Sequence, residues 1–179
     1  MKVILICDIG WRWFMSLADL DGFDADLAVR AGASGGHAGR LAALAPSQVL
    51  AVTALRRWAV AQNGDGRQQT RLLCAEFRSA LGSATTCAIA AFLRFVTVLG
   101  GSRSTPFRHY APCCPLLASD EACLAGLLQA CTAGRWGEAR LFADRLAGED
   151  GGGDLLTAAT ALASALARGG PCDAVPRAV

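Results

Sequence analysis

Three closely spaced prolines constrain the fold of this chain more than any other feature. Pro106, Pro112 and Pro115 lie within residues 102–118, between two long stretches of helical apolar spacing. Proline has no backbone N–H, and its ring disfavours helical backbone at the preceding residue, so a regular helix cannot run through this segment. Residues 102–118 are therefore predicted to form a long loop between two helical halves.

Before this loop, the spacing of apolar residues predicts three helices, at about residues 47–63, 67–81 and 84–99. Glycine-containing runs separate them, and Ser47 is a suitable N-cap for the first. The residues of their apolar faces are Val52, Leu55, Trp58, Ala59, Leu73, Phe77, Leu81, Ala88, Phe92, Phe95, Val96 and Leu99. These faces are predicted to form much of the core.

After the loop, three further helices are predicted. The first begins near Ser119, an expected N-cap, and ends before Gly134. The others cover about residues 136–147 and 154–168, and Asp154 is the expected N-cap of the last. The acidic residues that follow Ser119 are favourably placed against the positive end of the helix dipole.

The composition agrees with an all-α protein. A chain of 179 residues with 53% apolar side chains is long and apolar enough for one ordinary domain with a sizeable core. Short turns favour antiparallel neighbours in a helical chain. The predicted architecture is a single compact bundle of about six helices at residues 47–168.

The two ends of the chain are predicted to lie outside this bundle. Residues 1–46 are expected to form a weakly structured, loosely attached arm, in which residues 3–7 resemble a short strand and residues 16–29 have a partly helical pattern. Residues 169–179 are expected to be a flexible tail.

Charge is distributed unevenly, although the net charge is only +2. Residues 48–108 contain eight arginines against two acids, and Arg67, Arg71 and Arg78 lie towards one side of their predicted helix. Such a segment can steer an anionic partner or pair with the more acidic remainder of the fold. Nucleic-acid binding is not expected, because it would more often show a domain-wide basic excess with interleaved aromatic residues.

The eight cysteines favour a reducing, cytoplasmic location over a disulfide framework. Four of them lie in apolar helical patterns, where a free cysteine behaves as a small hydrophobe. The apolar run after Lys2 ends at Asp8 and is too short for a signal peptide. The apolar stretch at residues 87–99 is too short to span a bilayer, so no transmembrane segment is expected. Peripheral membrane contact through the aromatic N-terminus is left open.

The clearest candidate for chemistry is the run from His109 to Pro115, in which Cys113 and Cys114 stand between two prolines. His109, Cys113 and Cys114 are the candidate metal ligands, although the Cys-x-x-Cys spacing of structural zinc sites is absent. Redox chemistry at the thiol pair and simple packing of the loop are the alternatives. No catalytic or cofactor-binding residue is identified, because no nucleophile has a recognisable base and no phosphate-binding loop occurs.

Several short segments together resemble a family of short, uncharacterised bacterial helical proteins, classed as a domain of unknown function. They are Leu55-Arg56-Arg57, the helix around Phe77, Pro112-Cys113-Cys114-Pro115, Ser119-Asp120-Glu121 and the alanine-rich segment 157–163. The resemblance covers roughly residues 50–168, and some members have a third cysteine where Pro115 stands here. It implies a compact helical fold, no established activity and no catalytic residue to carry over.

Two functions are therefore considered. The first is a non-enzymatic helical protein that acts through self-association or a protein partner, as the high apolar content and the divided charge suggest. The second is a thiol- or metal-dependent function at Cys113 and Cys114. Neither requires a cofactor other than the metal itself.

Overall fold

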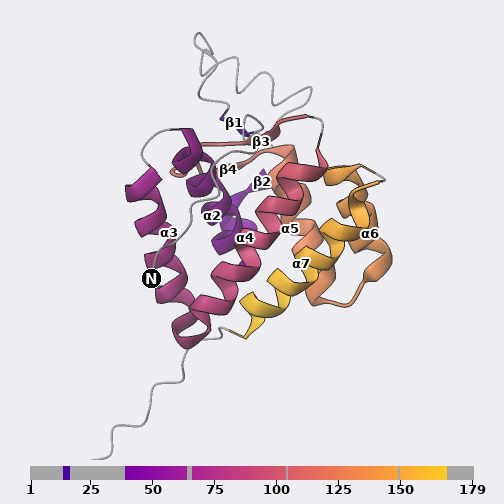
Figure 1. Ribbon diagram of the computed structural model, residues 1–179. Helices are drawn as coiled ribbons and strands as arrows, with labels where there is room; N and C mark the ends of the chain where they lie inside the picture. Colours follow the sequence, from indigo (N-terminus) through magenta and orange to yellow (C-terminus); the bar gives the residue numbers. More distant parts are fainter. Residues whose placement is uncertain (1–13, 17–38, 64–65, 104, 149, 169–179) are drawn as a thin grey trace, which may run out of the picture.

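The computed structural model describes residues 14–16, 39–63, 66–103, 105–148 and 150–168. Helices make up most of these residues and pack into a single bundle, with short strands grouped at one end (Figure 1). The chain is therefore all-α, as its sequence predicts.

The first half of the bundle contains α2 (Pro46–Asn63), α3 (Gly66–Leu81) and α4 (Thr85–Ser102). α3 packs mainly on α2 and more lightly on α4. A 3-10 turn, Gly82–Ala84, joins α3 to α4, and Gly82 has the left-handed φ of 53° that glycine tolerates best. Since α3, this turn and α4 form one continuous helical stretch, the described residues contain five helical bodies where about six are predicted.

The second half contains α5 (Ser119–Thr132), α6 (Trp136–Ala147) and α7 (Gly152–Ala167). These three helices pack on one another, and α7 also lies along α4, so that it connects the two halves. α5 and α6 approach closely because residue 126 is glycine: a Cβ there would lie 2.6 Å from Cζ of Phe142.

The core forms from the apolar faces that the sequence predicts. All but one of those residues are buried, and Trp58 packs against the core at its edge. Three aromatic side chains join α2, α3 and α4: the ring of Phe92 lies 5.7 Å from that of Phe77 and 6.5 Å, edge to face, from that of Trp58. Edge-to-face and tilted pairs at these separations add to the stabilisation from burial.

Two short strand pairs connect the predicted loop to earlier parts of the chain. β1 (Phe14–Ser16) runs parallel to β3 (Phe107–His109), and β2 (Gly39–Arg40) runs antiparallel to β4 (Leu116–Leu117). The loop is thus held at both ends by backbone pairing.

These pairings bear on the predicted N-terminal arm. Its described pieces, β1 and residues 39–46, contact the bundle, and Leu41 and Leu44 of the 3-10 segment after β2 pack against the core. The predicted strand at residues 3–7, most of the partly helical segment and the tail at 169–179 lie outside the described residues.

Helix starts differ from the sequence prediction, which places N-caps at Ser47, Ser119 and Asp154. In the structure Ser47 and Ser119 are already helical, and the last helix begins two residues before Asp154. The predicted N-caps are therefore wrong, because a serine just inside a helix gives the same local signal as one at its boundary.

Two of these helices begin instead with the same arrangement, an alanine followed three residues later by a long polar side chain. The backbone N–H of Ala45 donates to Oε1 of Gln48 at 2.9 Å, and that of Ala118 donates to Oε2 of Glu121 at 2.9 Å. Each bond satisfies a donor at the helix start, as the glutamine or glutamate of a capping box does.

One helical stretch among the described residues, Gly66–Ser102, is long and apolar enough to cross a membrane by length and composition. Its most apolar window has a mean hydropathy of 1.6 and is 28% buried. The turn at Gly82 lies within the stretch. The expectation that no segment spans a membrane stays a prediction.

Candidate functional site

The most unusual feature of the bundle is an arginine in its core. Arg56 lies on α2, one residue after the fully buried Leu55, and its side chain has no exposed surface. Position 56 follows Val52 by four residues and precedes Ala59 by three, so it belongs to the same buried helix face. A charged group in such a place requires an ionic partner and a full set of hydrogen bonds.

The ionic partner is Glu121, from the first turn of α5 and equally buried. Nε of Arg56 donates to Oε1 at 2.6 Å, and Nη2 donates to Oε2 at 2.8 Å. This two-pronged geometry matches the planar guanidinium to the carboxylate and is the strongest arrangement for such a pair.

The remaining donors of Arg56 bind the backbone of the proline loop, which we define as residues 105–118. Nη1 donates to the carbonyl oxygens of Cys114 at 2.6 Å and Ala111 at 3.3 Å, and Nη2 donates to that of Leu116 at 2.5 Å. A guanidinium has five N–H donors in a fixed plane, so one side chain can hold three separate points of the loop. We call Arg56, Glu121 and these three carbonyls the Arg56 clamp.

Glu121 extends the clamp to both ends of the loop. Its Oε1 accepts a bond from the backbone N–H of Tyr110 at 3.3 Å, and its Oε2 accepts the bond from Ala118 described above. The carboxylate also lies at the positive end of α5, which favours its charge. Since both charged side chains are fully enclosed, the clamp fixes the loop rather than meeting a ligand.

The loop displays its two cysteines differently. The N–H of Cys114 donates to the carbonyl of Ala111 at 3.0 Å, which closes a tight turn with Pro112 and Cys113 at its centre. Cys113 is exposed and Cys114 is half-buried. The rigid turn therefore presents one thiol to solvent.

The third candidate ligand, His109, is fully buried in β3, and its Nδ1 lies 3.1 Å from the carbonyl oxygen of Tyr110. The described residues contain no group of three or more histidine, cysteine or acidic side chains that could hold a metal ion. The structure thus leaves exposed Cys113 and buried His109 in different surroundings. The metal role of His109, Cys113 and Cys114 stays a prediction.

A second arginine holds the start of the loop. Arg103 follows α4 and donates from Nη2 to Oδ2 of Asp120 at 2.9 Å and from Nη1 to the carbonyl of Leu146, at the end of α6, at 2.7 Å. Its guanidinium also lies 5.4 Å from the ring centre of Phe107. Arg103 and the Arg56 clamp together attach the loop to α2, α5 and α6.

The two buried thiols of the bundle, Cys123 and Cys131, are expected to have low reactivity. Burial raises the pKa of Cys123 to about 11, and burial also raises the pKa of Cys131 although a hydrogen bond from Thr160 opposes it. A thiol with a raised pKa carries little thiolate at neutral pH and reacts slowly. Because the folded chain holds this proton more tightly, the contribution of Cys123 to stability is complete below pH 9 and is lost as the pH rises through about 11.

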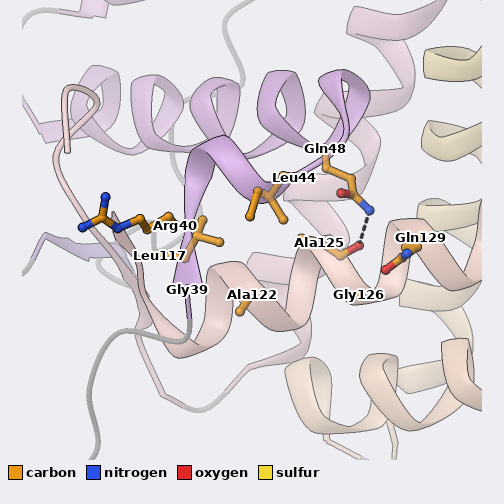
Figure 2. Close-up of a pocket in the computed structure, with 10 residues that line it drawn as sticks. Gly39, Arg40, Leu44, Gln48, Leu117, Ala122, Ala125, Gly126 and Gln129 are labelled. Carbon is orange, nitrogen blue, oxygen red and sulfur yellow. Dashed lines mark hydrogen bonds between the residues drawn. The ribbon is translucent and has the colours of Figure 1, made fainter. Parts of the chain in front are cut away.

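A small groove lies beside the loop, between residues 39–48 and α5 (Figure 2). It encloses about 240 Å³ and is lined mainly by apolar or small residues. Gln48 reaches across one end, where its Nε2 donates to the carbonyl of Ala125 at 3.3 Å, while the Arg40 side chain at the other end points away. Pockets for organic ligands usually enclose about 300–1,000 Å³, so this groove is below that range.

Comparisons with known proteins give no match: no family model, curated protein or solved structure is similar to this chain. The resemblance to bacterial helical proteins with a Pro-Cys-Cys loop therefore stays a prediction. What can be said of function comes from the geometry of the described residues.

Proposed function

We propose that this chain is a non-enzymatic helical protein that acts by self-association, with the outer face of α6 as the contact surface. The observation that carries the proposal is the exposure of Leu141, which lies opposite the buried residues of this short helix. Leu141 is 72% exposed, the highest value among the large apolar residues of the described chain. Trp136, the first residue of α6, is 55% exposed, but it leaves the helix about 140° from Leu141 and belongs to the end of the helix. A large apolar side chain that projects from a helix gains free energy when a partner covers it, since its apolar surface then leaves water.

The chemistry of the face favours a second copy of the chain as the partner. Leu141 and Gly137 are one turn apart on the outermost line of α6, and a Cβ at position 137 would have no atom within 4 Å. If two copies pair antiparallel about a two-fold axis, each Leu141 lies against Gly137 of the other copy. Such an interface needs one self-complementary patch, which a projecting side chain beside an open position provides.

Charges on α6 support the same arrangement. Arg140 pairs with Asp144 at 2.8 Å and Arg135 pairs with Glu138 at 2.8 Å, so four of the five charged side chains at this helix are balanced within one copy, and exposed Arg145 is the fifth. Two such faces therefore meet with little net repulsion. A helix of 12 residues is only about 18 Å long, so the contact belongs to the small, reversible class of interfaces.

Leu141→Ser is expected to abolish the association, because it removes the central apolar side chain without disturbing the core. Sedimentation velocity over a concentration series measures the result. The wild-type chain should move from a mass near 18.5 kDa towards twice that value as concentration rises, whereas the variant should stay near 18.5 kDa. Leu72→Ser on α3, also an exposed leucine, is the matched control and should behave as wild type. A wild-type chain that remains monomeric at every concentration overturns the proposal.

A second candidate function is thiol- or metal-dependent chemistry at the proline loop, and the exposure of Cys113 beside half-buried Cys114 favours it. Both candidate functions are consistent with a reducing, cytoplasmic location, which the free cysteines of the described residues support. The Arg56 clamp fixes the backbone on which both thiols stand, and a fixed backbone is what a reactive or ligating pair requires.

Thiol labelling at neutral pH and elemental analysis of protein purified without chelator test this candidate together. Cys113 should react several times faster than Cys87, another exposed thiol, on α4, if the proline loop activates it, while Cys123 and Cys131 should react only after unfolding. A metal bound in equal proportion to the chain, and lost in Cys113→Ser, would support ligation. No bound metal, together with equal rates at Cys113 and Cys87, counts against this candidate.

A further inference from the structure

The outer face of α3 is strongly basic. Arg67, Arg71 and Arg78 are all exposed, and no ion pair or hydrogen bond joins their side chains to another described residue. At 3.6 residues per turn, these three side chains leave the helix within about 40° of one another. They therefore form one positively charged stripe, which we call the α3 arginine stripe.

No acidic side chain of α3 offsets this stripe. Glu76 is the one acid in residues 66–102, and it faces α2, where its carboxylate pairs with Arg57 at 2.6 Å. The sequence alone leaves open whether the arginines of this region pair with the acidic remainder of the chain. In the structure Arg56 and Arg103 do so, with Glu121 and Asp120, and the stripe does not.

Two leucines of this part of the bundle are also exposed. Leu72 on α3 and Leu93 on α4 are each 37% exposed, and Leu72 leaves α3 about 100–140° from the three arginines, across the outer surface of the helix. The apolar window of the Gly66–Ser102 stretch is only 28% buried, whereas a core helix of that hydropathy would be buried over most of its length. Burial within the bundle therefore accounts for only part of the apolar character of this helical stretch.

We propose that the outer surface of α3 and α4 docks peripherally on an anionic lipid surface. Arginines at one edge of a helical surface and leucines at the other are a combination that binds the headgroup boundary of a membrane, where the cations meet lipid phosphates and the leucines enter the acyl region. A second copy does not fit this face, because two arginine stripes repel each other. Nucleic acid fits less well, because Phe77, Phe92 and Phe95 are buried and leave no aromatic side chain on this surface for bases to stack on.

Sedimentation of the full chain with vesicles tests this proposal independently of the self-association. Vesicles of phosphatidylcholine and phosphatidylglycerol in equal parts should bind the chain, and vesicles of phosphatidylcholine alone should not. Arg67→Gln with Arg71→Gln should weaken binding about thirtyfold, since each arginine near an anionic surface contributes about 1 kcal/mol. Salt at about 1 M should weaken binding as well, because it shortens the Debye length to about 3 Å.

The matched control removes the same charge elsewhere. Arg40→Gln with Arg108→Gln replaces two exposed arginines at the strand end of the bundle and should bind vesicles as wild type does. Leu72→Ser should weaken vesicle binding while leaving the self-association unchanged, and Leu141→Ser should abolish the self-association while leaving binding to vesicles in place. Any of three results overturns the proposal. The chain could bind both kinds of vesicle equally, or the two double arginine variants could lose vesicle binding equally. The chain could also bind short duplex DNA more tightly than anionic vesicles.

Discussion

Arg56→Met is expected to lower the free energy of unfolding by about 3–5 kcal/mol, the range found when one partner of a buried ion pair is removed. The variant leaves the carboxylate of Glu121 enclosed without its cation, and the carbonyls of Ala111, Cys114 and Leu116 lose their donors. Stabilities of single domains are about 5–15 kcal/mol, so this loss is a large share of the total. Chemical denaturation followed by circular dichroism measures it.

The next residue provides the control. Arg57 also forms an ion pair, with Glu76, but the two side chains are 20% and 31% exposed. Arg57→Met is therefore expected to cost at most about 1 kcal/mol, as surface pairs do. If Arg56→Met and Arg57→Met lower the free energy of unfolding equally, the burial of the Arg56 clamp contributes nothing to stability.

Phe92→Ala is expected to lower the free energy of unfolding by about 3–5 kcal/mol, the usual cost of deleting a buried aromatic ring. Phe92 is 1% exposed and is the ring that both Phe77 and Trp58 contact, so its removal leaves a cavity where α2, α3 and α4 meet. Chemical denaturation measures the change: a lower midpoint with an unchanged dependence of the free energy of unfolding on denaturant concentration means a loss of stability. A change in that dependence would mean that unfolding is no longer two-state.

Leu93→Ala is the control for this prediction. It shortens the adjacent residue of the same helix, but that side chain is 37% exposed. The expected loss is below about 1 kcal/mol, because little buried contact disappears. A loss in Phe92→Ala no larger than that in Leu93→Ala would contradict the packing described here.

The helices could be predicted from sequence because local signals define them. The sequence predicts residues 136–147 as a helix, and α6 has those bounds. α4 differs, because the chain remains helical through Gly100 and Gly101, whereas the sequence predicts that the helix ends at about residue 99. Oγ of Ser102 donates to the carbonyl of Val98 at 2.7 Å, and Arg103 then anchors the chain to α5 and α6. These later contacts are tertiary and leave no signal in the local pattern.

The Arg56 clamp could not be predicted in the same way. Its two charged residues are 65 positions apart. Its other three partners are backbone carbonyls, which every residue type has, so the sequence does not mark them. A signal was present nonetheless: Arg56 occupies a position on the apolar face that Val52 and Ala59 define, and an arginine there implies a buried acid. Glu121 appears from sequence only as a residue suited to a helix start, and its second role becomes visible in three dimensions.

The proline loop is more ordered in the structure than its sequence predicts. Its prolines correctly indicate the absence of a helix, but the sequence does not reveal that β3 and β4 within it pair with β1 and β2. Such pairs lie far apart along the chain and are only two or three residues long, too short for an alternating pattern. The loop is therefore a fixed part of the bundle.

A double-mutant cycle measures the coupling between Arg56 and Glu121 most directly. The free energies of unfolding of the wild type, Arg56→Met, Glu121→Gln and the double variant are compared. We expect the double variant to be more stable than the sum of the single losses predicts, by about 2–3 kcal/mol, because the second substitution removes a group that the first has already left unpaired. Losses that add within about 0.5 kcal/mol would show that the two side chains act independently and would contradict the clamp.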